Sequence, residues 1–201
     1  MPRLLLPALA VGLIGTVLAR PAAAQDPRLK RLDAGTRPLV AALLDSARAA
    51  GLPAEPLVQR ALEGTIKGAP GDRIVAAVRR LAADLGRARD ALGPAASPPE
   101  LEAGAAALRA GAAPAVLTEL RRTRRQPLTV PLAVLADLVA SGVPADSAAT
   151  AVLALAPSAR DADLVEFRRA VERDIALGAP PAAAASVRVN AAAREARPGP
   201  P

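Results

Sequence analysis

Three acidic side chains lie close together in the stretch DADLVEF, at Asp161, Asp163 and Glu166. Carboxylate oxygens are the ligands that a hard cation such as Ca²⁺ prefers, and paired carboxylates also perform glycoside hydrolysis. The stretch lacks the glycine and the ligand spacing of a known calcium-binding loop, and acidic residues at a helix start stabilise the helix dipole. We therefore interpret the stretch as a helix start, with a carboxylate- or metal-dependent enzyme as an alternative hypothesis.

The stretch LRRTRR concentrates positive charge, with Arg121, Arg122, Arg124 and Arg125 in five residues and Arg109 expected nearby. Cations at the end of a short helix interact favourably with its free carbonyl groups, which is the simpler interpretation. The functional interpretation is contact with an anionic envelope surface or with an acidic groove of a protein partner. We expect no nucleic acid as partner, because the protein is predicted to be exported and its single aromatic residue, Phe167, provides no platform on which successive bases could stack.

Catalysis would have to proceed without the residue types that most often perform it. The chain contains no His and no Cys, and Phe167 is its only aromatic residue. These absences remove the commonest general base and any thiolate metal ligand. Neither Lys30 nor Lys67 follows a serine in the Ser-x-x-Lys pattern, and no glycine-rich phosphate loop is present. The sequence therefore predicts a non-catalytic protein without a cofactor.

Residues 1–24 have the pattern of a cleavable secretory signal peptide. A short basic start, MPR, precedes an apolar run of 16 residues, and Ala22-x-Ala24 then offers a cleavage site before Gln25. A membrane span needs about 20 apolar residues, so the run is short for one. We expect cleavage between Ala24 and Gln25 and no transmembrane segment afterwards. A retained N-terminal anchor is the alternative.

The composition of the remaining chain suits an exported bacterial protein. Arginine outnumbers lysine 24 to 2, and alanine, proline and glycine are abundant, all of which have GC-rich codons in bacteria. Removal of the signal peptide leaves 177 residues, with 24 basic and 19 acidic side chains mixed along the chain. This length is sufficient for one domain with a hydrophobic core, without disulfides. We predict a periplasmic or extracellular location.

Apolar residues recur with helical periodicity along nearly the whole chain, and no stretch alternates as a strand. The sequence predicts an all-α protein of eight or nine short helices, with Leu39 and Ile66 among the core residues. Thr36 and Ser158 are expected to cap the first and eighth helices, the latter with Asp161 three residues later. The predicted domain organisation is a flexible leader at 25–35, one helical domain at 36–196 and a disordered tail at 197–201.

The pattern SPPE predicts the start of the fourth helix, because Ser97 and Glu100 have the spacing of a capping box. Proline at the first helical position, which Pro98 would occupy, supports this start.

A Gly-apolar-Pro triplet marks the helix ends, at Gly51, Gly68, Gly142 and Gly178, and Gly111 begins a variant with one extra residue before proline. Glycine adopts the left-handed conformation that ends a helix, the apolar residue folds back, and proline starts the next helix. The spacing of the triplets is irregular, and the tetratricopeptide and ankyrin patterns are absent. The corners therefore predict either an irregular α-solenoid or a compact orthogonal helical bundle.

Three functions remain compatible with the sequence. The leading hypothesis is an exported, non-catalytic helical interaction or scaffold protein with an unknown protein partner. The first alternative is a peripheral protein that binds an anionic envelope surface through the LRRTRR arginines. The second alternative is the carboxylate- or metal-dependent enzyme.

Overall fold

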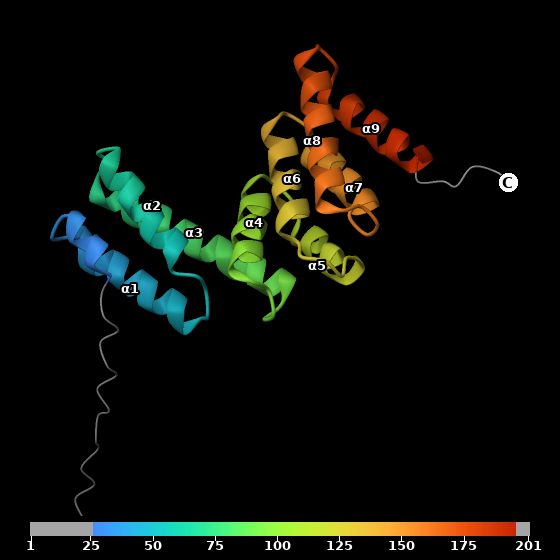
Figure 1. Cartoon of the computed structure of the whole chain (residues 1–201). Helices are drawn as coiled ribbons and strands as arrows, with labels where there is room; N and C mark the ends of the chain where they lie inside the picture. Colours follow the sequence, from blue (N-terminus) through green and yellow to red (C-terminus); the bar gives the residue numbers. More distant parts are fainter. Residues whose placement is uncertain (1–25, 196–201) are drawn as a thin grey trace, which may run out of the picture.

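The computed structural model describes residues 26–195, and in this range the chain forms a short 3₁₀-helix followed by nine α-helices, with no strand (Figure 1). The elements are η1 (Pro27–Arg31), α1 (Thr36–Ala49), α2 (Glu55–Ile66), α3 (Gly71–Leu92), α4 (Pro98–Arg109), α5 (Pro114–Thr123), α6 (Thr129–Ala140), α7 (Ala145–Leu155), α8 (Asp161–Ala176) and α9 (Pro181–Glu195). The all-α prediction is confirmed.

Several predictions concern segments that the structure does not describe. The signal peptide at 1–24, its cleavage between Ala24 and Gln25, and the tail at 197–201 all lie outside residues 26–195. Within that range, none of the helices combines the length and the apolar character that a bilayer crossing requires.

The helices stack in the order of the chain. Extensive contacts between the described helices join elements one or two positions apart: α4 packs against α3 and α6, and α6 packs against α8. Helices α5, α7 and α9 form a second row, in which α7 contacts both of the others. Figure 1 shows the same progression, since neighbouring colours lie side by side from α1 to α9. The described helices therefore form an all-helical bundle whose contacts follow the order of the chain.

A single apolar core runs along the stack. Leucines from successive helices are almost completely buried, including Leu44 of α1, Leu85 of α3 and Leu117 of α5. Helix α6 is enclosed on most sides, because its neighbours in both rows cover it, and it buries Leu132, Leu135 and Leu138. Each such side chain stabilises the fold by about 1.5–3 kcal/mol when it leaves water.

The predicted corners are confirmed at all five glycines. Their φ angles are positive, from 65° at Gly68 to 107° at Gly111. In each corner the N–H of the next residue donates a hydrogen bond of 2.8–3.0 Å to the carbonyl five residues before it, as Leu52 does to Ala47. This bond is the mark of the Schellman motif, which closes the end of a helix around a left-handed glycine. The triplet is therefore a structural joint between helices.

Of the caps at α1 and α4, one differs from the prediction. Asp33, and not Thr36, closes the start of α1: its Oδ1 accepts hydrogen bonds from the N–H groups of Gly35 and Thr36 at 3.0 and 2.8 Å. Thr36 is buried in the first turn instead. The capping box at α4 is confirmed, since Glu100 accepts a hydrogen bond of 2.9 Å from the N–H of Ser97.

The segment predicted as a flexible leader is folded onto the first helices over residues 26–35. Residues 26–35 contain η1, whose Leu29 is 2% exposed, and Leu32 beside it is 3% exposed. The guanidinium of Arg28 also lies 2.6 Å from the carboxylate of Glu55 in α2. The helical domain therefore begins before Thr36, because two isolated leucines in a charged stretch pack against α1 and α2 without any periodic pattern.

Two predicted core residues are exposed. Leu39 of α1 is 55% exposed and Ile66 of α2 is 72% exposed. Helix α1 lies at the end of the stack and packs mainly on α3. This one neighbour covers only part of the apolar face of α1, so Leu39 at the edge of that face stays exposed. Ile66 is the last residue of α2, directly before the Gly68 corner, where the chain turns away from the core.

Candidate functional site

The four arginines of LRRTRR have different surroundings. Arg124 is 3% exposed, and the side chain of Arg121 turns toward α4 and is 35% exposed. Arg122 is exposed but pairs with Glu119 of its own helix at 2.6 Å. Only Arg125 is both exposed and without an ion pair within the described residues. The predicted four-arginine contact surface is therefore wrong for Arg124, which is buried. Arg121 and Arg122 face carboxylates of the same chain, so within the described part of the chain Arg125 alone keeps a free charge among the four.

Arg124 joins the ends of three helices. It lies at the C-terminus of α5, and its Nη1 donates hydrogen bonds to the carbonyl of Ala156 and, at 2.7 Å, to that of Ala159. Its Nη2 donates to the carboxylate of Asp161, the first residue of α8. The free carbonyls at the end of a helix need such donors. We name these four residues the Arg124 clamp, and its role is structural.

The acidic stretch DADLVEF is mostly engaged at the start of α8. Asp161 belongs to the Arg124 clamp, and Asp163 accepts hydrogen bonds from the backbone and side chain of Arg160, which lower the pKa of Asp163. The prediction that Ser158 caps this helix is wrong, because the helix begins at Asp161 and Asp163 accepts the hydrogen bond from the N–H of Arg160 before it. Glu166 is exposed. No cluster of three or more metal-ligating side chains occurs within residues 26–195.

Glu100 is a buried carboxylate that ties α4 to the loop between α5 and α6. It accepts hydrogen bonds of 2.9 Å from the N–H groups of Ser97 and Leu128, and it lies 3.0 Å from Nη2 of Arg121. Burial raises the pKa of Glu100, but these hydrogen bonds outweigh burial and lower it to about 2. A general acid needs the opposite shift, so Glu100 is a structural anion.

A groove between α2, α3 and α4 gathers four arginines, of which only Arg109 was named from the sequence. Arg60 of α2, Arg80 and Arg87 of α3 and Arg109 of α4 line it, and Leu81 contributes an apolar surface. The hollow measures about 500 Å³ and adjoins a second hollow of about 230 Å³ that shares Arg60, Leu81 and Arg109. We name this surface the arginine groove.

The four arginines of the groove differ in their counter-charges. Two of them pair with an acidic residue one turn away on their own helix: Arg60 with Glu63 at 3.4 Å, and Arg87 with Asp84 at 2.7 Å. Arg80 and Arg109 are exposed and have no acidic group within ion-pair distance in the part of the chain that the structure describes. Two guanidinium groups are therefore available to an outside ligand.

Helix geometry explains why these arginines meet. Arg80 and Arg87 are two turns apart on α3, so they lie on one face with Asp84 between them. Arg109 lies in the last turn of α4, about 14 Å along the helix from Glu100, at 1.5 Å per residue. The expectation that Arg109 lies near LRRTRR is therefore wrong, because Arg121 contacts the opposite end of α4.

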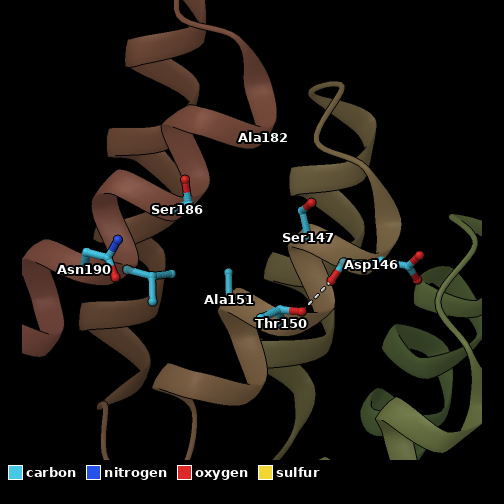
Figure 2. A pocket seen from close by; sticks show the side chains of 8 residues that line it. Asp146, Ser147, Thr150, Ala151, Ala182, Ser186 and Asn190 are labelled. Carbon is cyan, nitrogen blue, oxygen red and sulfur yellow. Dashed lines mark hydrogen bonds between the residues drawn. The ribbon is translucent and has the colours of Figure 1, made fainter.

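A separate hollow of about 370 Å³, away from the arginine groove, lies between α7 and α9. Figure 2 shows Ser147 and Thr150 of α7 opposite Ser186 and Asn190 of α9. The hydroxyls of Thr150 and Ser186 donate to backbone carbonyls of their own helices, at 2.8 and 3.0 Å. Asp146 is the only titratable residue in its lining, and among the described residues neither Thr150 nor Ser186 directs its hydroxyl to the Asp146 carboxylate, as an activated nucleophile would. Its chemistry suits polar contacts.

Comparison with known proteins adds nothing to these assignments. No protein family, curated protein or solved structure matches the chain.

Proposed function

We propose that the protein is an exported, non-catalytic helical interaction protein that binds a protein partner in the arginine groove. One observation carries the proposal: Arg80 and Arg109 project from different helices into the same groove without an acidic partner among the described residues. The buried Arg124, by contrast, already has its donors satisfied within the Arg124 clamp. Stacked helical repeats commonly use such open surfaces for binding.

The chemistry of the groove supports binding. Its lining supplies guanidinium groups, carboxylates and apolar side chains, and it contains no nucleophile beside a base. Two of its carboxylates, Glu63 and Asp84, are already held by arginines of their own helices. Arginine side chains combine a planar donor group with an apolar stem, which makes them frequent contributors to protein interfaces.

The LRRTRR stretch offers less free charge for an anionic envelope surface than its sequence suggests. Arg124 is committed to the clamp and Arg121 to Glu100. The two remaining side chains carry one free charge between them, because Arg122 pairs with Glu119. Electrostatic attachment to a membrane needs clusters of several basic residues.

Site-specific photocrosslinking in the native bacterium tests the proposal. The photoreactive residue p-benzoylphenylalanine is placed at Ala83, an exposed residue of the groove, and in a control chain at Ala42, an exposed residue of α1. We expect a discrete crosslinked protein from the first position only, and its loss in the variant R80Q/R109Q. If position 83 gives no reproducible product, the proposal fails.

Export is tested separately by cell fractionation and by mass spectrometry of the purified protein. We expect the protein in the envelope or the medium, with Gln25 as its first residue. A chain that keeps residues 1–24 in the cytoplasmic fraction would contradict export and leave the groove's role open to the crosslinking result.

A further inference from the structure

We infer that the partner presents to the arginine groove a short acidic segment in which isolated carboxylates alternate with apolar residues. This inference rests on the proposed function, since it names the chemistry of the ligand for the same surface. Two carboxylates of this partner segment would pair with Arg80 and Arg109. Charge-assisted, bidentate contacts between arginine and carboxylate are among the strongest hydrogen bonds in proteins.

The distribution of charge in the groove selects against a dense polyanion. Beside its four arginines the lining includes three carboxylates, of Asp84, Glu63 and Glu102. A ligand with closely spaced phosphates would meet those carboxylates as well as the free guanidinium groups, and like charges in contact are costly. A ligand with two separated carboxylates neutralises Arg80 and Arg109 and avoids this repulsion.

The apolar part of the lining indicates the rest of the ligand. Ala77, Leu81 and Ala83 of α3 line the same hollow as the arginines. The methylene stems of arginine add further apolar surface beneath their charged ends. The main hollow, at about 500 Å³, has the size of a pocket that encloses a small organic ligand. It therefore accommodates a short segment with one or two apolar side chains, and not a whole folded surface.

The shape of the site disfavours a bilayer as occupant. The free arginines line a hollow between three helices, and three carboxylates lie beside them. Attachment to anionic lipids is favoured by clustered basic residues facing the membrane surface. Binding to a lipid surface would therefore overturn the inference, and the test below includes it as an outcome.

Selection from a random peptide library on the immobilised mature protein tests the inference. Peptides that bind the wild-type chain are counter-selected against R80Q/R109Q, and their affinities are measured by fluorescence anisotropy. We expect the retained peptides to be enriched in Asp and Glu and to lose at least about tenfold in affinity on R80Q/R109Q. Their affinity should also fall as salt is added, because the exposed charges are screened.

A matched control separates groove binding from net charge. The variant R125Q/R169Q removes the same charge from two exposed arginines that do not line the groove and lie on other parts of the chain. Peptide affinity should change by less than about twofold in this variant, because screening weakens distant charges. Circular dichroism of both variants checks that the helical fold is kept.

The outcomes distinguish the inference from the proposed function. If the peptides depend on Arg80 and Arg109 but are not enriched in acidic residues, the acidic class is overturned and the binding function stands. If no retained peptide depends on these arginines, and Ala83 gives no crosslinked protein, both are overturned. If the protein instead sediments with phosphatidylglycerol vesicles in an Arg80-dependent manner that acidic peptides do not compete, the ligand is a lipid surface.

Discussion

The α2–α3 and α8–α9 hairpins turn at the same Gly-Ala-Pro triplet, beginning at Gly68 and Gly178. Both glycines have positive φ, 65° and 98°, and both corners close with the same Schellman hydrogen bond. The helices that follow differ in what they contribute to the core. Helix α3 buries Ile74, Val78 and Leu81, whereas the matching positions of α9 are Ala184, Arg188 and Ala191.

The contact between the two helices of each hairpin differs accordingly. In α2–α3, Gly64 allows close approach, since a Cβ atom there would lie 2.8 Å from Ile74. In α8–α9 the positions of Gly64 and Val78 are taken by Asp174 and Arg188, which form two hydrogen bonds of 2.7 Å. A partly exposed ion pair stabilises less than a buried apolar contact. The corner thus specifies the turn, and the helix faces decide how firmly the hairpin is held.

The largest test of this comparison makes α3 resemble α9. Ile74→Ala places at position 74 the residue that α9 has at 184, and Ile74 is 4% exposed. We expect the free energy of unfolding to fall by about 3 kcal/mol, because the lost methylenes leave a cavity in the core. Urea unfolding followed by far-UV circular dichroism measures it. A loss below about 1 kcal/mol would mean that α3 is held no more firmly than α9.

The buried anion in the middle of the stack should dominate the acid limb of stability. The pKa of Glu100 is about 2 in the folded chain and 4.5 ordinarily, so its contribution is complete above pH 4.5 and is lost as the pH falls through 2. At about 1.4 kcal/mol per pKa unit, it amounts to about 3 kcal/mol. Unfolding free energies measured across this range should therefore decline on acidification.

Glu100→Gln provides the matched control for the acid limb. The variant should be less stable at neutral pH and should have a flatter decline between pH 4.5 and 2, because its amide does not titrate. Asp174 also has a lowered pKa, caused by its hydrogen bonds from Arg188. If Asp174→Asn flattens the decline more than Glu100→Gln does, the end of the stack matters more than its middle.

Two arginines test whether buried polar contacts stabilise more than exposed ones. Arg124→Gln removes donors from the carbonyls of Ala156 and Ala159, and an unsatisfied buried acceptor costs about 1–3 kcal/mol. We expect a loss of about 2 kcal/mol, measured by urea unfolding. Arg188→Gln should barely shift the global midpoint, because its side chain is 39% exposed and its partner belongs to the last hairpin. Equal effects would contradict the comparison.

The joints of the fold could be predicted because they depend on local chemistry. A left-handed glycine, an apolar residue and a proline act within a few residues of one another, and all five corners form as expected. Burial at the ends of the stack could not be predicted in this way. Leu29 is buried and Leu39 exposed, although Leu39 has the more regular apolar neighbours, because only the position of a helix in the stack decides which stripe is covered.

The candidate site depended even more on packing. LRRTRR is compact in sequence, but α5 ends inside it, at Thr123, and the backbone of Arg124 is extended. Arg121 and Arg122 lie on the helix, where successive residues point about 100° apart, so the members of LRRTRR face different surroundings. Arg124 is thereby drawn into the interior and Arg122 remains outside. Arg60, Arg80 and Arg109 are far apart in the sequence, and only the packing of three helices brings them to one groove. The spacing of Arg80 and Arg87 on α3 was the one local signal.

The smallest expected effect compares the two Gly-Ala-Pro corners directly. At both Gly68 and Gly178 an added Cβ meets no atom within 4 Å, so alanine costs only backbone strain, about 1 kcal/mol at positive φ. Because α3 belongs to the core, Gly68→Ala should lower the global free energy of unfolding by this amount. Gly178→Ala should instead speed hydrogen exchange in α9 and leave global unfolding nearly unchanged. Gly86→Ala, in an open position within α3, is the control and should stabilise by about 0.5–1 kcal/mol. If Gly178→Ala lowers global stability as much as Gly68→Ala, α9 unfolds together with the core. The two hairpins would then contribute equally to global stability, although α3 packs through larger apolar side chains than α9 does.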